Sequence, residues 1–175
     1  FCTTPEIKEE SAVLSVRAEV ESHLDIPVGV TIKASVFKLD RNGNALPGPV
    51  AESVAATAGL NASSSHIFRV DIPVGEPKLW NLDDPQLYRA VVTVLKGNET
   101  MDVYGTNFGF RTLNFTARDG FFLNGKKIPV HGVCNHHDLG ALGAAFNTRA
   151  AERQLEILKE MGCNAIRTSH NPPAP

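Results

Sequence analysis

The chain has 175 residues, of which 42% are apolar and 21% charged, and its net charge is −2. This composition is typical of a soluble globular protein and excludes long disordered tails and collagen-like repeats. The charge gives no sign of a nucleic-acid partner, because the longest basic run is the pair Lys126–Lys127. No stretch approaches the roughly 18 consecutive apolar residues that a membrane helix needs.

Short runs of alternating apolar and polar side chains fill the first hundred residues. The runs lie at 12–21, 28–36, 50–58, 65–72, 87–96 and 99–111. Alternation of this kind places the apolar side chains on one face, as in half-buried strands. Turn residues such as Asn42 and Gly43 separate the runs, and no helical pattern interrupts them. Residues 1–112 are therefore predicted to form an antiparallel β-sandwich of the immunoglobulin type.

One loop of this predicted sandwich gathers Trp80, Asp83, Asp84, Pro85 and Tyr88. Two interpretations are open: a binding patch, or a structural loop that precedes the strand at 87–96. Proline and paired aspartates are typical turn residues, and a lone tryptophan commonly packs over a sheet edge. We favour the structural interpretation.

The pattern changes after Arg118. Residues 121–130 predict a small hairpin with a turn at Asn124–Gly125, and residues 128–133 predict a short apolar strand. A glycine-rich loop follows from Asn135 to Phe146.

A helix is predicted over residues 148–161, with Asn147 or Thr148 as its N-cap and Gly162 at its end. Its expected buried face consists of Ala151, Leu155, Leu158 and Met161. The opposite, solvated face carries Glu152, Glu156 and Glu160, which we do not consider catalytic candidates.

A second short strand is predicted at 164–167, which gives the order strand, helix, strand and favours parallel pairing. One such unit leaves apolar faces and strand edges uncovered. We therefore expect the chain to be a fragment of an α/β barrel or doubly wound sheet, and its last part to need a neighbouring chain or domain.

Polar side chains follow both of these strands. His136 and Asp138 come after the first strand, and Arg167 and His170 after the second. In parallel α/β folds the active site forms at the carboxyl ends of the strands, so these groups are expected to line one pocket for a polyhydroxylated ligand. The alternative is that they satisfy buried backbone groups in the loops. His131 lies inside the predicted strand and is interpreted as a core histidine.

Two further interpretations concern metals and thiols. Cys2, Cys134 and Cys163 are an odd set without CxxC spacing, which indicates buried or free thiols. His131, His136, His137, Asp138 and His170 could be read as a divalent-metal site. Neighbouring histidines in extended backbone cannot easily face one ion, so we predict no metal site in this chain.

Three ordered motifs resemble glycoside hydrolase family 2, which includes β-galactosidases, β-glucuronidases and β-mannosidases. They are GFFLNGK at 120–126, HGVCNHHD at 131–138 and NAIRTSHNP at 164–172, preceded by FGFR at 108–111. The resemblance implies a jelly-roll domain, then an immunoglobulin-like sandwich, then a catalytic (β/α)8 barrel. Residues 1–112 would be the sandwich, and residues 113–175 the incomplete first part of the TIM barrel.

The resemblance also implies roles for single residues. His136 and His170 match histidines that contact the sugar, and Arg167 matches the arginine that supports the nucleophilic carboxylate. Asp138 occupies a place where some members use a substrate-contacting acid, and Asn135 is expected beside them in substrate binding. Asn171 departs from the tyrosine of many members and resembles β-galactosidase-like bacterial members more than glucuronidases.

Members of this family use two glutamates, about 5–5.5 Å apart, in a retaining double displacement. These glutamates come from later barrel strands, and no residue of this chain is assigned to either role. The chain is therefore expected to belong to a β-glycosidase, most closely a β-galactosidase of carbohydrate metabolism, and to be inactive alone. The alternative is a non-catalytic carbohydrate-binding or adhesion module, in which residues 1–112 would bind a glycan by themselves.

The expected partner is a carbohydrate substrate, without nucleic acid or membrane, and the full-length parent is expected to be an oligomer. No cofactor is expected in this chain, while a divalent or monovalent cation is an option for the parent. The sequence leaves the compartment open, with the bacterial periplasm or cell exterior favoured over the cytoplasm.

Overall fold

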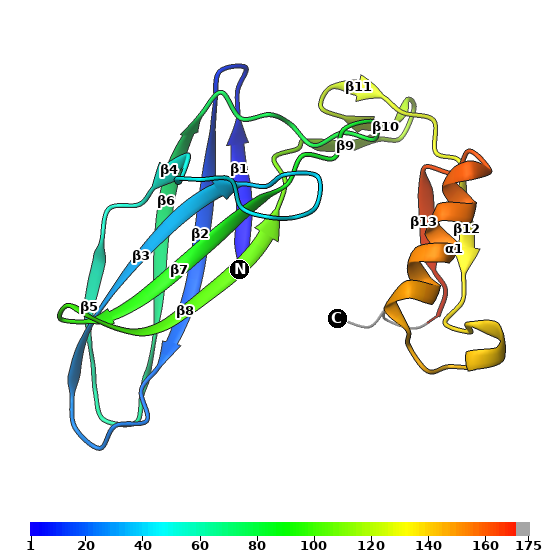
Figure 1. The fold of residues 1–175 in the computed structure, drawn as a ribbon. Coiled ribbons are helices and arrows are strands. Elements are labelled where there is room, and N and C mark those ends of the chain that lie inside the picture. Colours follow the sequence, from blue (N-terminus) through cyan, green and yellow to red (C-terminus); the bar gives the residue numbers. More distant parts are fainter. Residues whose placement is uncertain (171–175) are drawn as a thin grey trace. The chain divides into compact units, whose positions relative to one another are not determined.

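The computed structural model describes residues 1–170, which form two compact units that divide between Thr112 and Leu113. Each unit has its own sheets (Figure 1). The first unit is a sandwich of antiparallel strands, and the second contains a small antiparallel sheet followed by a strand, a helix and a strand. Within the described residues, no helix is long and apolar enough to cross a membrane.

One sheet of the sandwich has the strand order β1–β2–β6. It consists of β1 (Cys2–Ile7), β2 (Ser11–Glu21) and β6 (Ser65–Gly75). β2 and β6 pair along their whole length, from Ser11 opposite Gly75 to Glu21 opposite Ser65. The sequence did not predict β1, which contains Pro5 and changes register against β2 between Thr3 and Glu6.

The other sheet has the order β4–β3–β7–β8, and β5 also pairs with β3. Its strands are β3 (Val28–Lys38), β4 (Ala51–Glu52), β5 (Ala56–Leu60), β7 (Tyr88–Lys96) and β8 (Glu99–Phe108). Every predicted run is found here or in the first sheet, although the run at 50–58 is split into two short strands. The prediction of an immunoglobulin-like sandwich is confirmed.

The core of the sandwich lies between the two sheets. Leu14, Ile32, Val36 and Ile72 are fully buried because alternation turns them inward. Phe110, which follows β8, is 0% exposed and makes edge-on contacts of 5.1 Å with two further rings, Tyr88 and Phe108. Burying one such side chain stabilises the fold by about 1.5–3 kcal/mol.

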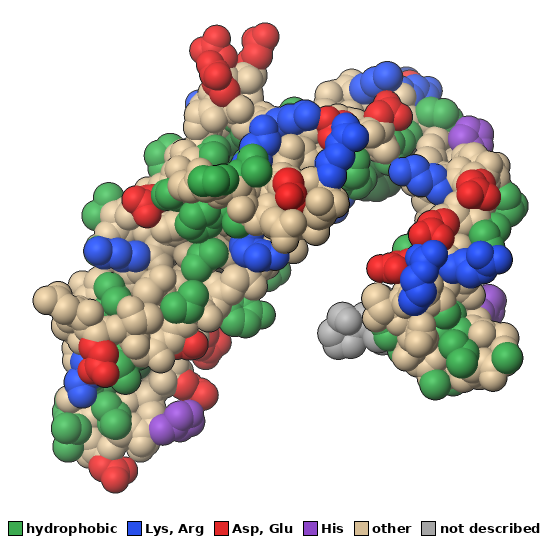
Figure 2. Space-filling view, in the orientation of Figure 1, with side chains coloured by type: hydrophobic (Ala, Val, Ile, Leu, Met, Phe, Trp, Pro, Cys, Tyr) green, Lys and Arg blue, Asp and Glu red, His purple; other side chains and the backbone are tan. Residues whose placement is uncertain are grey.

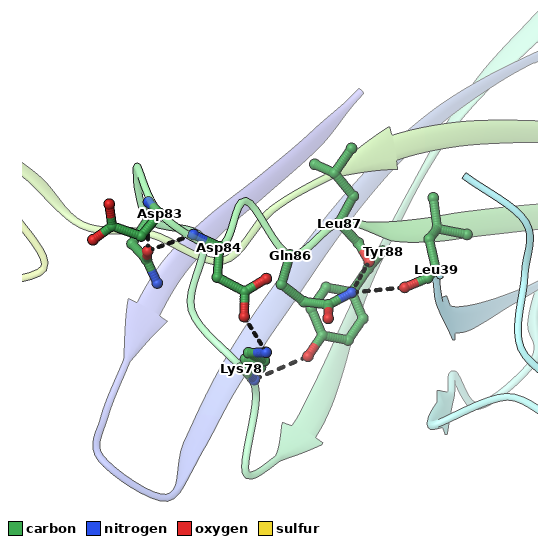
Figure 3. Close-up of polar contacts among 8 residues, drawn as sticks. Leu39, Lys78, Asp83, Asp84, Gln86, Leu87 and Tyr88 are labelled. Carbon is green, nitrogen blue, oxygen red and sulfur yellow. Dashed lines mark hydrogen bonds and ion pairs between the residues drawn. The ribbon is translucent and has the colours of Figure 1, made fainter. Parts of the chain in front are cut away.

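The polar loop between β6 and β7 is held by bonds within the sandwich (Figure 3). Asp84 forms an ion pair with Lys78, whose backbone N–H donates to the Tyr88 hydroxyl at 2.9 Å. Gln86 donates through its amide to the carbonyl oxygens of Leu39 and Leu87. These bonds give the polar residues of the loop structural partners. They support the interpretation of the segment as a structural loop over its interpretation as a binding patch.

The first part of the second unit is a small sheet with the order β11–β10–β9. It contains β9 (Leu113–Thr116), β10 (Gly120–Leu123) and β11 (Lys126–Lys127). Asn124 and Gly125 both have positive φ, at 50° and 74°, as the predicted two-residue hairpin turn requires. The sequence did not predict β9.

A parallel pair of strands with one helix follows. It comprises β12 (Gly132–Asn135), the 3-10 turn η1 (Gly140–Leu142), α1 (Thr148–Glu160) and β13 (Ala165–Thr168). The strand predicted at 128–133 begins only at Gly132, so that prediction is wrong in position. Ile128 still donates its N–H to Phe121 of the hairpin, and Pro129 has no N–H to give to a new ladder.

The helix begins and ends as predicted, but its buried face differs. Asn147 caps it by accepting the N–H of Ala150 at 3.0 Å, and Gly162 follows it with a φ of 88°. Leu155 and Met161, expected to be buried, are 46% and 68% exposed. A pair of strands is a narrow surface, so the helix covers it along one line of residues and these two side chains lie beyond it.

Acidic and basic side chains lie side by side on the exposed face of α1 (Figure 2). Arg149 binds the carboxylates of Glu152 and Glu156, with N–O distances of 3.2 and 2.8 Å. These glutamates are engaged in exposed ion pairs, as expected of a solvated helix face.

Candidate functional site

The candidate site lies at the carboxyl ends of β12 and β13. The parallel register pairs Asn135 with Thr168, so the residues that follow each strand emerge side by side. The rings of His136 and His170 accordingly lie 5.4 Å apart between centroids, tilted by 57°. His170 has a φ of 65°, a left-handed conformation that costs a non-glycine residue energy and is often found at functional sites.

The register is held at the opposite ends of the strands by Asn164. Its side chain accepts the N–H of His131 at 2.9 Å and donates to the carbonyl of Pro129 at 2.8 Å. Its own backbone N–H donates to the carbonyl of His131 at 2.9 Å. His131 is exposed and precedes β12, so its interpretation as a core histidine within the strand is wrong.

Gly132, the first residue of β12, allows the two strands to approach. A Cβ atom added at this position would lie 2.8 Å from the carbonyl oxygen of Ala165 on β13. That distance is shorter than any van der Waals contact, so a side chain here would push the strands apart. The close pairing that brings His136 to His170 therefore depends on a glycine.

Arg167 faces a thiol within the strand pair. It lies opposite Cys134 in the register, and its Nη1 atom is 3.7 Å from the Cys134 Sγ atom. The guanidinium, and after it the Ser169 hydroxyl, lower the pKa of the Cys134 thiol below its usual value. Cys134 is free and exposed, whereas Cys2 and Cys163 are free and half-buried.

The loop after β12 is attached to α1 by a glutamine that the sequence analysis did not single out. Gln154 accepts a hydrogen bond from the Asn135 side chain at 3.4 Å and donates to the backbone carbonyl of Asp138 at 3.5 Å. The Asp138 carboxylate accepts the N–H of Gly140 at 2.8 Å. Gln154 lies between Ala151 and Leu158 on the inner side of the helix. A polar residue on this otherwise apolar face is the feature of the sequence that could have identified it.

The five predicted site residues thus have different surroundings. His136 and His170 face each other, and Arg167 contacts a cysteine. Asn135 and Asp138 bind α1 and their own loop, and the predicted roles of all five residues toward a substrate stay predictions. Within residues 1–170 no group of three His, Cys, Asp or Glu side chains is placed to hold a metal ion. The motif residues from Asn171 onward lie outside the described part.

The chemistry of this edge suits a ligand rich in hydroxyl groups. Imidazole both donates and accepts hydrogen bonds, and the guanidinium provides a rigid fork of donors. Asp138 supplies the one carboxylate in the predicted set. The arrangement offers several hydrogen-bonding groups for a sugar and does not by itself contain a pair of catalytic carboxylates.

Both units match family models. The model described as glycosyl hydrolases family 2 covers residues 1–111, and the model of the TIM barrel domain of the same family covers residues 116–175.

Relatives match the whole length of the chain. A β-galactosidase from Bacteroides ovatus is 45% identical over 175 residues, which are 100% of this chain and 20% of that protein. The crystal structure of a family 2 member from Bacteroides cellulosilyticus has a TM-score of 0.88 and 33% identity, and the match covers 99% of this chain and 22% of that one. The crystal structure of a Bacteroides uniformis β-glucuronidase has a TM-score of 0.85 and 30% identity, and the match covers 99% of this chain and 20% of that one. The chain spans about a fifth of the length of these relatives.

Proposed function

The chain belongs to glycoside hydrolase family 2, and from that premise we propose that it is part of a retaining β-glycosidase that hydrolyses terminal β-galactosides. The observation that carries the proposal is the pair His136 and His170 at the ends of two parallel strands, 5.4 Å apart. In barrel enzymes this edge of the sheet holds the substrate.

The residues of this chain bind and orient the sugar. His136 and His170 exchange hydrogen bonds with its hydroxyl groups, while Arg167 orients the carboxylate of the nucleophile. Fixing both reacting partners converts the attack into an effectively unimolecular step. Asn164 and Gly132 contribute indirectly, because they set the register from which the two histidines emerge.

Bond cleavage requires two carboxyl groups that we assign to other parts of the enzyme. One protonates the leaving oxygen, the other attacks the anomeric carbon, and water then hydrolyses the glycosyl-enzyme. The chain spans about a fifth of its relatives and has no residue assigned to either role. We therefore expect no turnover from the 175 residues alone.

Galactosides are preferred over glucuronides on sequence similarity. The β-galactosidase of Bacteroides ovatus is 45% identical to this chain over 175 residues, against 35% over the same length for a putative β-glucuronidase of Formosa agariphila. This difference supports the choice of galactosides as the substrate.

The test is His170→Ala in the full-length enzyme that contains this chain, with an aryl β-galactoside as substrate. Loss of hydrogen bonds worth about 2–3 kcal/mol in the transition state should lower kcat/KM by about 30–160-fold. His23→Ala is the control, since His23 is an exposed residue of the sandwich. An unchanged kcat/KM for His170→Ala would contradict the sugar-binding role.

A second substrate separates the two levels of the proposal. The wild-type enzyme should cleave the aryl β-galactoside faster than the matching aryl β-glucuronide. Faster cleavage of the glucuronide would overturn the choice of sugar and leave the β-glycosidase assignment standing. Cleavage of neither substrate, nor of the matching aryl β-mannoside, would overturn both.

A further inference from the structure

Cys134 is a free, exposed thiol at the centre of the strand pair, and the glycosidase proposal gives it no role. We propose that Cys134 is an oxidation site, at which hydrogen peroxide converts the thiol to a sulfenic acid. The argument rests on the two groups that lie against the sulfur, Arg167 and Ser169.

The first group is a cation. Arg167 lies opposite Cys134 in the register of β12 and β13, with Nη1 3.7 Å from Sγ. A neighbouring guanidinium favours the thiolate, which is the nucleophilic form of cysteine. The parallel ladder fixes both backbones, so the sulfur and the cation stay close without any rearrangement of the chain.

The second group is a buried hydroxyl with an unused hydrogen-bonding capacity. Ser169 is only 3% exposed, and its Oγ atom has no hydrogen-bond partner of ordinary geometry among the described residues. The hydroxyl is nevertheless near enough to Cys134 to lower the pKa of the thiol. A buried polar group without a partner is costly. An oxygen added to Sγ would provide the acceptor that this hydroxyl lacks.

The reaction needs only peroxide. The thiolate sulfur attacks one peroxide oxygen, a sulfur–oxygen bond forms and the oxygen–oxygen bond breaks. The leaving hydroxide takes a proton from solvent and becomes water. Sulfur is oxidised by two electrons and the peroxide is reduced by two.

Oxidation would change the strand-end site as well as the cysteine. Because Arg167 Nη1 lies 3.7 Å from Sγ, a sulfenate oxygen on that sulfur would accept a hydrogen bond from Arg167 and compete for the guanidinium with a carboxylate or another ligand. Oxidation of Cys134 is therefore expected to weaken the contact of Arg167 with the carboxylate that it orients in the proposed enzyme. The inference requires no sugar and no turnover, so it can fail while the glycosidase proposal holds.

The experiment exposes the 175-residue chain to hydrogen peroxide at pH 7 with dimedone present, which traps sulfenic acid. Peptide mass spectrometry then gives a trapping rate for each cysteine, in the folded chain and in the chain unfolded by guanidinium chloride. Unfolding makes every thiol accessible, so it can only raise a rate that was limited by burial. We expect Cys134 to be trapped about fivefold faster in the folded chain than in the unfolded one.

Variants identify the cause of the activation. Arg167→Gln should lower the folded rate to that of the unfolded chain, while Arg153→Gln removes an exposed cation from α1 and should leave it unchanged. Ser169→Ala keeps the cation and should lower the rate by a smaller factor. Amide hydrogen exchange of β12 and β13 checks that the strand pair is formed in the wild type and in each variant. A folded rate for Cys134 no higher than its unfolded rate would overturn the proposal, as would Arg167→Gln reacting like the wild type.

Discussion

The sandwich and the unit that begins at Leu113 differ in the interactions that fix the positions of their side chains. In the sandwich, antiparallel strands up to eleven residues long turn alternate side chains into a shared apolar core. In the second unit α1 has no buried residue, and the strands β12 and β13 have four residues each. Polar bonds hold that unit's geometry, through Asn164, Gln154 and Asn147.

The difference shows what each unit can tolerate. A core distributes its stability over many side chains, while a set of single hydrogen bonds makes a site depend on a few residues. We expect truncation of a core residue to cost the sandwich much free energy. In the second unit we expect smaller energies but larger effects on where His136 and His170 lie.

The largest effect is expected for Phe110→Ala in the sandwich. Phe110 is 0% exposed and contacts two aromatic rings, so its removal leaves a cavity and should cost about 3–5 kcal/mol in the free energy of unfolding. Urea unfolding followed by fluorescence of Trp80, the one tryptophan of the sequence, measures this in the sandwich alone. Tyr104→Ala, at a side chain 70% exposed on β8, should change it by less than about 0.5 kcal/mol. Equal losses of unfolding free energy in Phe110→Ala and Tyr104→Ala would show that the buried core does not dominate the stability of the sandwich.

The next effect is expected for Gly132→Ala in the strand pair. The new methyl group would meet the Ala165 carbonyl and should cost about 1–3 kcal/mol while separating β12 from β13. Amide hydrogen exchange of both strands should become faster. Gly59→Ala on β5 is the matched control, because nothing lies within 4 Å of its added Cβ. Unchanged exchange in β12 and β13 would show that the close approach is not required.

Removal of the helix cap should cost less. Asn147→Ala deletes the acceptor for the Ala150 N–H and should destabilise α1 by about 1 kcal/mol. The expected readout is faster exchange of the first-turn amides, without a change in β7 or β8 of the sandwich. Asn147→Asp retains an acceptor and should restore protection. If Asp and Ala behave alike, the side chain is not acting as a cap.

The smallest effect concerns the exposed ion pair of the sandwich. Lys78 lowers the pKa of Asp84, so the pair stabilises the fold above the usual aspartate pKa and loses this contribution as pH falls through the lowered value. Urea midpoints of wild type and Asp84→Asn should therefore differ slightly at pH 7 and converge toward pH 3. Both side chains are substantially exposed, so solvent screening keeps the difference small. Asp83→Asn is the control, and a difference that grows on acidification would contradict the assignment.

The sequence predicted the sandwich well because alternation along a strand is a local pattern. Val30, Ile32, Ala34 and Val36 alternate with less buried residues, and all four are buried in β3. The strand β1 escaped notice because Thr3, Thr4 and Pro5 carry no such pattern. Its pairing with β2 depends on partners elsewhere in the chain, which a local pattern does not contain.

The second unit was predicted in kind but not in detail. The order strand, helix, strand followed from the helix periodicity and its caps, whereas the position of β12 depended on bonds from Asn164, thirty-three residues beyond His131. The burial of Leu155 and Met161 depends on the width of the surface that α1 covers, which helix periodicity cannot give. The pairing of His136 with His170 was expected from parallel geometry. The contacts of Gln154 and Cys134 arise from side chains whose directions no spacing rule specified.

The three hydrogen bonds of Asn164 have a consequence for protein engineering. They align β12 and β13 at the ends where the strands begin, remote along each strand from the loop 136–147. Alignment from that end should leave the middle of this loop, residues 139–146, free to vary in length and composition without displacing the two strands. A library that randomises residues 139–146 and keeps Asn164 could therefore recruit new ligand contacts without moving the strand pair, whereas a one-residue slip of β12 against β13 would turn every side chain of β12 to the opposite face of the strand.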